Sequence, residues 1–177
     1  MNIVPLFLGE DDNVSKAREE KMKGIVIDEG EEYFTFLGKL FKALDNIQKD
    51  YNWLISDHVC YPEDANYAKR LSAEWCWMTG TELTEMIEHE DFQWIWGVLS
   101  GFPKHETKEE VLKYKLPNAM ENDRIWQNPI SMQHPLSLME IIAWDSSMTV
   151  FISRSDDIID RIVKSNFLTK DLEEYNL

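Results

Sequence analysis

The chain has 177 residues, 44% of them hydrophobic, and it contains seven tryptophans. This length accommodates one domain with a substantial core, and this composition excludes a largely disordered chain. The 33 acidic residues outnumber the 18 lysines and arginines and give a net charge of −15, which disfavours nucleic-acid binding because phosphate backbones are also negative. We expect the same charge to attract a basic protein partner.

The organisation of the chain changes at residue 23. Residues 1–23 predict an N-terminal arm and a charged connection, with an edge strand or extended arm at residues 3–8, and residues 24–177 predict a single α+β domain. The start of the chain lacks the basic region of a secretory signal, and no apolar run approaches the roughly 20 residues that span a bilayer. Because the only two cysteines, Cys60 and Cys76, make no disulfide framework, we expect a cytoplasmic protein that does not bind membranes.

The most apolar and aromatic passage, residues 92–99, predicts the central strand of a sheet. Both its odd-numbered and its even-numbered positions carry apolar residues, as in a strand that is covered on both faces. Strict alternation places Trp94 and Trp96 on one face, and Trp75 and Trp77 share a face of another strand in the same way. Such pairs either pack in the core or build a platform for a ligand or partner.

Helices are predicted where apolar residues recur with a helical period. The first follows Asp28 and Glu31, which have the spacing of a capping box, and Thr81 opens the second. The predicted helices lie at residues 30–45, 81–90, 107–114 and 155–166. With the shorter apolar runs, they predict an α+β domain in which about four helices pack against a mostly antiparallel sheet of five or six strands.

Five acidic residues and no lysine or arginine lie between Glu82 and Asp91. Like charges at helical spacing do not stabilise a helix, so the cluster forms either a solvated face or a docking surface for a cationic partner. The predicted partner-binding residues are Glu82, Glu85, Glu88, Glu90 and Asp91, with Trp126 among the aromatic side chains that rim the surface.

Residues 117–135 are rich in proline and asparagine and predict a long ordered loop that Trp126 anchors. Long loops in compact domains often carry function. A pocket between this loop and the tryptophan-rich sheet would gather polar groups such as Arg124, His134 and Asp145.

The chain contains no recognised catalytic motif. Its glycines form neither a dinucleotide fingerprint nor a P-loop, and the passage from Gly97 to Gly101 has one residue too many for a nucleophile elbow. His58 and Cys60 have a spacing that could share a metal, but an ordinary structural pair is the preferred interpretation. Glu140 is expected to face outward if its hairpin has one polar face. We therefore predict no catalytic residue, no metal and no cofactor.

Two functions are consistent with these patterns. The first is a non-enzymatic cytoplasmic protein-binding domain, such as a bacterial acidic immunity protein or toxin inhibitor, which docks a basic partner with the help of electrostatic steering. The alternative is a small-molecule-binding protein or small hydrolase whose pocket lies between the tryptophan-rich sheet and the 117–135 loop.

Overall fold

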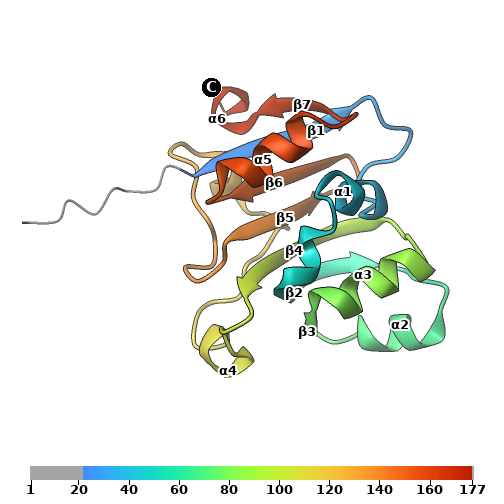
Figure 1. The fold of residues 1–177 in the computed structure, drawn as a ribbon. Helices are drawn as coiled ribbons and strands as arrows, with labels where there is room; N and C mark the ends of the chain where they lie inside the picture. Colours follow the sequence, from blue (N-terminus) through green and yellow to red (C-terminus); the bar gives the residue numbers. More distant parts are fainter. Residues whose placement is uncertain (1–21, 177) are drawn as a thin grey trace, which may run out of the picture.

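The computed structural model describes residues 22–176, so the arm expected at residues 3–8 lies outside the described part of the chain. The described residues form one seven-stranded antiparallel sheet with the order β3-β2-β4-β5-β6-β1-β7 (Figure 1). The strands are β1 (Lys23–Glu29), β2 (Tyr51–Cys60), β3 (Trp75–Thr79), β4 (Trp94–Pro103), β5 (Met139–Trp144), β6 (Met148–Ser153) and β7 (Leu168–Asp171). The helices are α1 (Gly38–Ala43), α2 (Ala65–Arg70), α3 (Gly80–His89), α4 (Lys108–Val111), α5 (Asp156–Val163) and α6 (Leu172–Tyr175), with 3-10 helices η1 (Ile47–Asp50) and η2 (Asp123–Trp126).

Three helices cover one face of the sheet. Figure 1 shows α1, α3 and α5 in front of the strands, and their buried residues share one core cluster with the strand residues of that face. Full burial of a large apolar side chain stabilises a fold by roughly 1.5–3 kcal/mol. The helix residues in this cluster are Leu40, Phe41, Leu83, Met86, Ile87, Ile158, Ile159 and Ile162.

The opposite face is covered by α6 and by the long connection between β4 and β5. Ala119 and Ile125 of the connection and Leu172 of α6 are buried against strand residues of this face. Val111 of α4 packs with Phe102 in a smaller cluster beside them. The connection therefore lies directly on the sheet.

The predicted central strand is confirmed as β4, an interior strand that pairs with β2 and β5. The predicted shared face of Trp94 and Trp96 is wrong, because Trp94 is buried among the helix-side residues and Trp96 packs in the opposite cluster. The cause is a β-bulge. Two consecutive residues of β2 pair with Trp94 and Trp96, so Ile95, which lies between these tryptophans, is the extra residue of β4. Trp75 and Trp77 do share a face, where both pack in the smaller cluster.

The α+β class and the antiparallel sheet are confirmed, but the described chain has seven strands and six α-helices, more than the five or six strands and about four helices predicted. The missed strand is β7, a short and mostly exposed segment that pairs with β1. The missed helices α2 and α6 are six and four residues long, too short to show a helical period. Among the described helices, none has both the length and the hydropathy of a bilayer-spanning segment.

The helix predicted at residues 30–45 is much shorter in the structure, where α1 begins at Gly38. Thr35 has a φ of 67°, which a continuous right-handed helix excludes. The carboxylate of Asp28, the expected cap, instead accepts hydrogen bonds from side chains of β7 and α6. The first N–H groups of α1 are accepted by the carboxylate of Asp91. The other three predicted helices are present as α3, α4 and α5.

Candidate functional site

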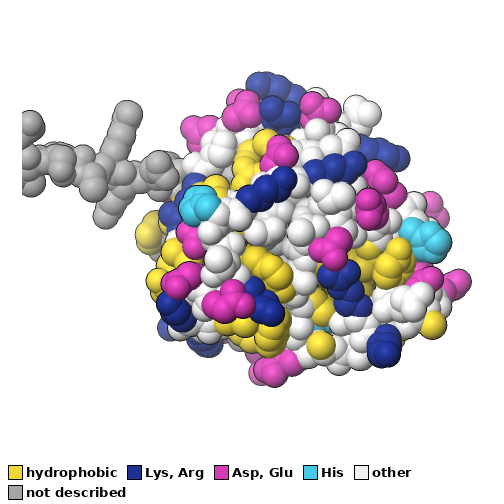
Figure 2. Space-filling view, turned by 60° about the horizontal axis from the view of Figure 1, so that its bottom comes forward, with side chains coloured by type: hydrophobic (Ala, Val, Ile, Leu, Met, Phe, Trp, Pro, Cys, Tyr) yellow, Lys and Arg dark blue, Asp and Glu magenta, His cyan; other side chains and the backbone are white. Residues whose placement is uncertain are grey.

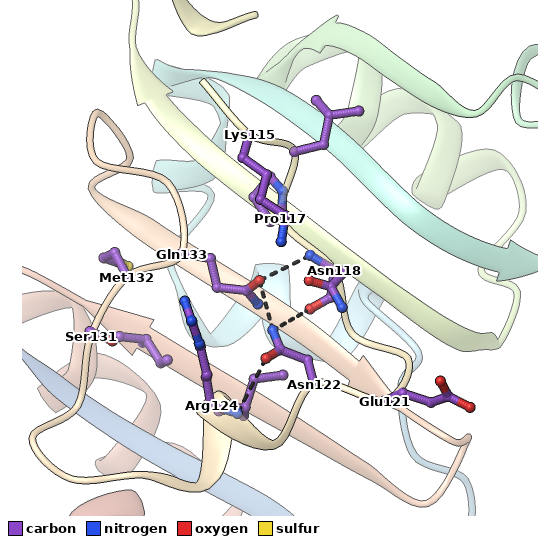
Figure 3. A pocket seen from close by; sticks show the side chains of 12 residues that line it. Lys115, Pro117, Asn118, Glu121, Asn122, Arg124, Ser131, Met132 and Gln133 are labelled. Atoms are coloured by element: carbon purple, nitrogen blue, oxygen red, sulfur yellow. Dashed lines mark hydrogen bonds between the residues drawn. The ribbon is translucent and has the colours of Figure 1, made fainter. Parts of the chain in front are cut away.

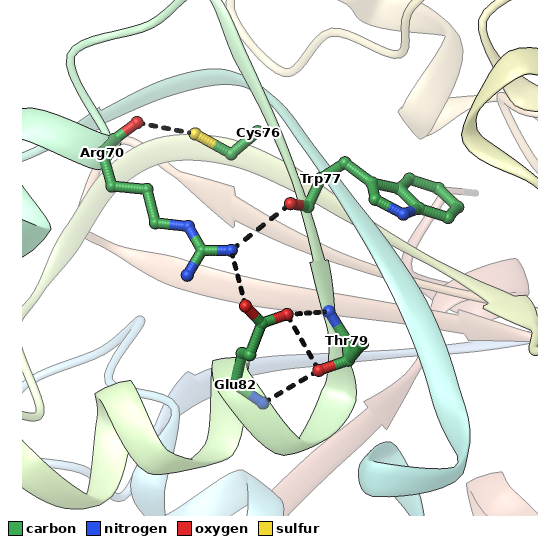
Figure 4. A network of polar contacts seen from close by, with 5 residues as sticks. All are labelled: Arg70, Cys76, Trp77, Thr79 and Glu82. Atoms are coloured by element: carbon green, nitrogen blue, oxygen red, sulfur yellow. Dashed lines mark hydrogen bonds and ion pairs between the residues drawn. The ribbon is translucent and has the colours of Figure 1, made fainter.

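Glu82, the first residue of the predicted acidic surface, stabilises the start of α3. It accepts hydrogen bonds from the backbone N–H and the hydroxyl of Thr79, the N-cap, and pairs with Arg70 at 3.2 Å (Figure 4). Arg70 also donates to the carbonyl of Trp77 at 3.4 Å. Partial burial opposes ionisation, but the Thr79 hydrogen bonds and the Arg70 charge outweigh it and lower the pKa of Glu82. The helix is thus capped at Thr79, two residues before the predicted Thr81.

Three of the other four acids also have local partners. Glu90 accepts the two N–H groups that precede α2, at 2.5 and 3.0 Å. Asp91 accepts two N–H groups at the start of α1, both at 3.0 Å. Glu88 lies 3.7 Å from the Nζ of Lys49. Glu85 is exposed and, alone of the five, has no partner among the described residues. On the face shown in Figure 2, acidic side chains are interspersed with lysines and arginines.

The structure places Trp126 on the opposite side of the sheet from α3, which corrects the prediction that it rims the acidic surface. Trp126 belongs to η2 and lies edge-on to Trp144, with ring centroids 5.0 Å apart. Its centroid is 5.8 Å from that of Tyr175 in α6. Trp126 therefore contacts both the sheet and the C-terminal helix from within the long connection.

The long connection encloses a cavity of about 360 Å³ against the sheet, which we call the loop pocket (Figure 3). Its walls come from residues 115–133 and from Ile152 of β6. A hollow of about 470 Å³ also lies between α1 and α3, but most of its polar side chains already have partners. The polar side chains that line the loop pocket are Lys115, Asn118, Glu121, Asn122, Arg124, Ser131 and Gln133.

A buried carboxylate in β5 holds one wall of the loop pocket. Glu140 is fully buried and accepts hydrogen bonds from the N–H groups of Gln133 at 3.0 Å and His134 at 2.9 Å. The hydroxyls of Ser137 and Ser100 also donate to it, at 3.1 and 3.5 Å. Burial raises the pKa of Glu140, although these four donors favour its ionised form. The expectation that Glu140 faces outward is therefore wrong, because its apolar neighbours belong to a strand that is covered on both faces.

Two residues of β2 hold the opposite wall. The carboxylate of Asp57 accepts the N–H groups of Ala119 and Met120, both at 2.7 Å. Ser56 donates its hydroxyl to the carbonyl of Pro117, also at 2.7 Å. Asp57 has a φ of 47° and lies at the bulge between β2 and β4. The pocket is thus attached to the sheet at both ends and is already formed without a ligand.

Lys115, Arg124 and Gln133 line the loop pocket with nitrogen donors that have no partner among the described residues, and the hydroxyl of Ser131 and the carboxylate of Glu121 have none there either. The Oε1 of Gln133 accepts from the N–H of Asn118 at 2.9 Å and from the Nδ2 of Asn122 at 3.0 Å, whereas its Nε2 is buried and has no partner in the described part of the chain. The guanidinium of Arg124 and the ammonium of Lys115 are exposed and bond to no other described residue. The unpaired groups at the pocket are therefore mainly hydrogen-bond donors.

Of the three polar residues expected to converge at such a pocket, the structure brings only Arg124 there. His134 is fully buried beside it, where its Nε2 bonds to the carbonyl of Val111 at 3.1 Å and its Nδ1 accepts from the N–H of Leu136 at 3.2 Å. Asp145 lies in the turn between β5 and β6, with a φ of 47°. His134 therefore has a structural position, and Asp145 does not line the pocket.

The buried imidazole of His134 should make stability depend on pH. Burial lowers its pKa below the ordinary 6.5, although the Val111 carbonyl acts in the other direction. The unfolded chain takes up this proton at a higher pH than the folded chain, so the free energy of unfolding should fall as the pH drops below about 6.5. His134→Gln keeps a donor and an acceptor without titrating, and should show a shallower fall in urea unfolding between about pH 7.5 and 5. Some slope should remain, since burial also lowers the pKa of His58. Identical slopes in the two proteins would contradict this assignment.

The pair considered for metal binding has one imidazole nitrogen in a backbone contact and a thiol that stays protonated. His58 bonds through Nε2 to the carbonyl of Leu71 at 2.9 Å. Burial, with a smaller effect of Cys76, raises the pKa of Cys60 to about 12, so this thiol stays protonated near neutral pH. The described residues include no group of three or more histidine, cysteine, aspartate or glutamate side chains placed to hold a metal ion.

Comparison with known proteins places the chain in a family. A family model described as "Protein of unknown function (DUF2691)" matches residues 22–116, more than half of the chain. The matched part runs from β1 to α4 and ends within the first residues of the loop pocket. No curated protein and no solved structure matched. The chain belongs to the DUF2691 family.

Proposed function

We propose that the protein binds a small polar molecule in the loop pocket. The observation that carries this proposal is a preformed cavity of about 360 Å³ whose walls carry donors of Arg124, Lys115 and Gln133 with no partner in residues 22–176. Pockets for small ligands have volumes of roughly 300–1,000 Å³ and a few polar groups that orient the ligand. Because Glu140 and Asp57 fix both walls, little ordering would be needed on binding.

The lining favours binding over hydrolysis. It contains one hydroxyl, that of Ser131, and neither a histidine nor a cysteine. A nucleophilic serine needs a base within hydrogen-bond distance, and the nearby His134 uses both ring nitrogens in backbone contacts. We therefore assign this site to recognition without a chemical step.

A blocking variant tests the proposal. The purified protein is screened against a library of metabolites by thermal shift, and the hits are titrated by calorimetry. We expect a hit that binds the parent and the control Ser72→Trp, an exposed position near α2, but not Ser131→Trp, in which the indole fills the pocket mouth. A hit that binds Ser131→Trp as tightly as the parent, or the absence of any hit, would refute the proposal.

Docking of a basic protein, in the manner of an immunity protein or toxin inhibitor, is the second proposed function. It is favoured by the net charge of −15 and by Glu85, which is exposed on α3 and has no partner among the described residues. Its test is the double variant Glu85→Lys and Glu88→Lys, which leaves the Glu82 cap intact. Association with a basic partner at low salt should weaken in this variant and persist in Glu109→Lys, on the other side of the sheet. Equal association of both variants would exclude α3 as the docking surface.

A further inference from the structure

We infer that the loop pocket is selective for an anion, a carboxylate or phosphate group carried by a small organic molecule. This inference rests on the proposed function, because it names the class of ligand for the same site. It depends on three independent features of the pocket, namely an unpaired guanidinium, a second cation, and a buried amide whose donor has no acceptor.

Arg124 is the first feature. The other described arginines all have partners: Arg70 and Arg161 pair with carboxylates, and Arg154 donates to two backbone carbonyls. Arg124 alone among them has no side-chain hydrogen bond or ion pair, in a protein whose acids outnumber its bases by 33 to 18. A guanidinium presents paired N–H groups that match the two oxygens of a carboxylate or phosphate.

The second feature is the charge balance of the lining. Lys115 and Arg124 lie at opposite ends of the pocket in Figure 3, and neither has a carboxylate partner within the part of the chain that the structure describes. Glu121 is the one acid in the lining, so two cations face one carboxylate there, and all three side chains are exposed. The lining is therefore net positive on a strongly negative protein, and this local potential favours an anion at this position.

The third feature is the orientation of the Gln133 amide. Its oxygen accepts two hydrogen bonds, from Asn118 and Asn122. Rotating the amide by 180° would direct its NH₂ group at these two donors, so the observed orientation is fixed and the Nε2 must donate elsewhere. This nitrogen is buried and has no acceptor among the described residues, which is a costly state, and a ligand oxygen that reached it through a small movement of the loop would relieve that cost.

The remaining lining indicates an organic anion in place of a bare ion. Ile125, Met132 and Ile152 provide apolar surface, and the cavity of about 360 Å³ is much larger than a single phosphate or sulfate needs. A ligand that combines an oxyanion with a short apolar part would use both kinds of wall. The shared chemistry is the oxyanion, whichever of the two groups carries it.

The test compares matched charged and neutral probes by calorimetry. Glutarate and phenyl phosphate serve as the anions, and glutaramide and phenol as their neutral counterparts. We expect at least one anion to bind at least tenfold more tightly than its neutral counterpart. Arg124→Gln should weaken that binding at least tenfold, and Gln133→Glu, which replaces the free donor by an acceptor, should abolish it. Lys69→Gln is the control and should bind like the parent, since Lys69 is exposed on α2 and its side chain has no partner among the described residues.

The outcomes separate this inference from the proposed function. Neutral probes that bind as tightly as the anions, or anion binding that survives in Arg124→Gln, would overturn anion selectivity. Neutral library hits that are lost in Ser131→Trp would in that case still support the pocket as a binding site. Circular dichroism checks that each variant is folded, and the exposed position of Arg124 makes it suited to this substitution.

Discussion

Replacing Glu140 by alanine should lower the free energy of unfolding by about 3 kcal/mol, since two buried N–H groups lose their acceptor and each orphaned donor costs roughly 1–3 kcal/mol. These are the N–H groups of Gln133 and His134, at the start of the turn that leads into β5. Removing a buried carboxylate also removes its desolvation cost, which offsets part of the loss. Urea unfolding at neutral pH measures the effect.

Two further variants define the cause. Glu140→Gln keeps the volume but directs an NH₂ group toward backbone donors, so its loss should lie between those of Glu140→Ala and the parent. Glu109→Ala, at an exposed position of α4, should change stability by less than about 0.5 kcal/mol. If Glu140→Ala lost less than about 1 kcal/mol, the two N–H groups would have found other acceptors, and Glu140 would not hold the pocket wall.

Gly80→Ala is expected to destabilise the protein by about 3 kcal/mol, although alanine normally improves a helix by up to about 1 kcal/mol over glycine. A Cβ at this position would overlap the carbonyl oxygen of Gln48 and would lie 2.8 Å from its carbonyl carbon and 2.9 Å from the Cα of Lys49. All three atoms belong to the backbone of η1, so no side-chain rotation relieves the overlap. The first turn of α3 would have to move away from η1.

The control for this substitution is the next residue of the same helix. Thr81 is exposed, and Thr81→Ala should leave stability within about 0.5 kcal/mol of the parent in the same urea experiment. A Gly80→Ala protein as stable as the parent would show that α3 and η1 can separate at little cost. Such a result would contradict the close backbone approach at the start of α3.

Long periodic segments were predictable from the sequence, and features that depend on distant partners were not. β4, β5, β6, α3 and α5 follow from apolar patterns within each segment. The start of α1 was misplaced because Asp91, more than fifty residues away in sequence, accepts its first N–H groups. The shared face of Trp94 and Trp96 failed because a bulge depends on the neighbouring strand.

The candidate site shows the same division. Proline and asparagine in residues 117–135 predicted an ordered loop, and a pocket does lie beside it, but the sheet contributes Ile152 to the lining and no tryptophan. The roles of Glu140 and Gln133 could not be predicted, because both depend on which residues the loop brings together. One feature of the sequence did point to the buried position of Glu140. A single acid within an apolar strand indicates a carboxylate that is hydrogen-bonded inside the protein, although the alternation of the strand taken alone predicts an outward side chain.

The hydrogen bond from the Arg70 guanidinium to the carbonyl of Trp77 bears on contacts between molecules as well as on the fold of one chain. β3 is the last strand at its end of the sheet, and outward-facing backbone groups on such a strand can pair with a strand of another molecule. The Arg70 guanidinium occupies the Trp77 carbonyl at 3.4 Å. An incoming chain would have to displace this side chain and its Glu82 partner before an intermolecular sheet could grow, so we expect the pair to disfavour aggregation through β3.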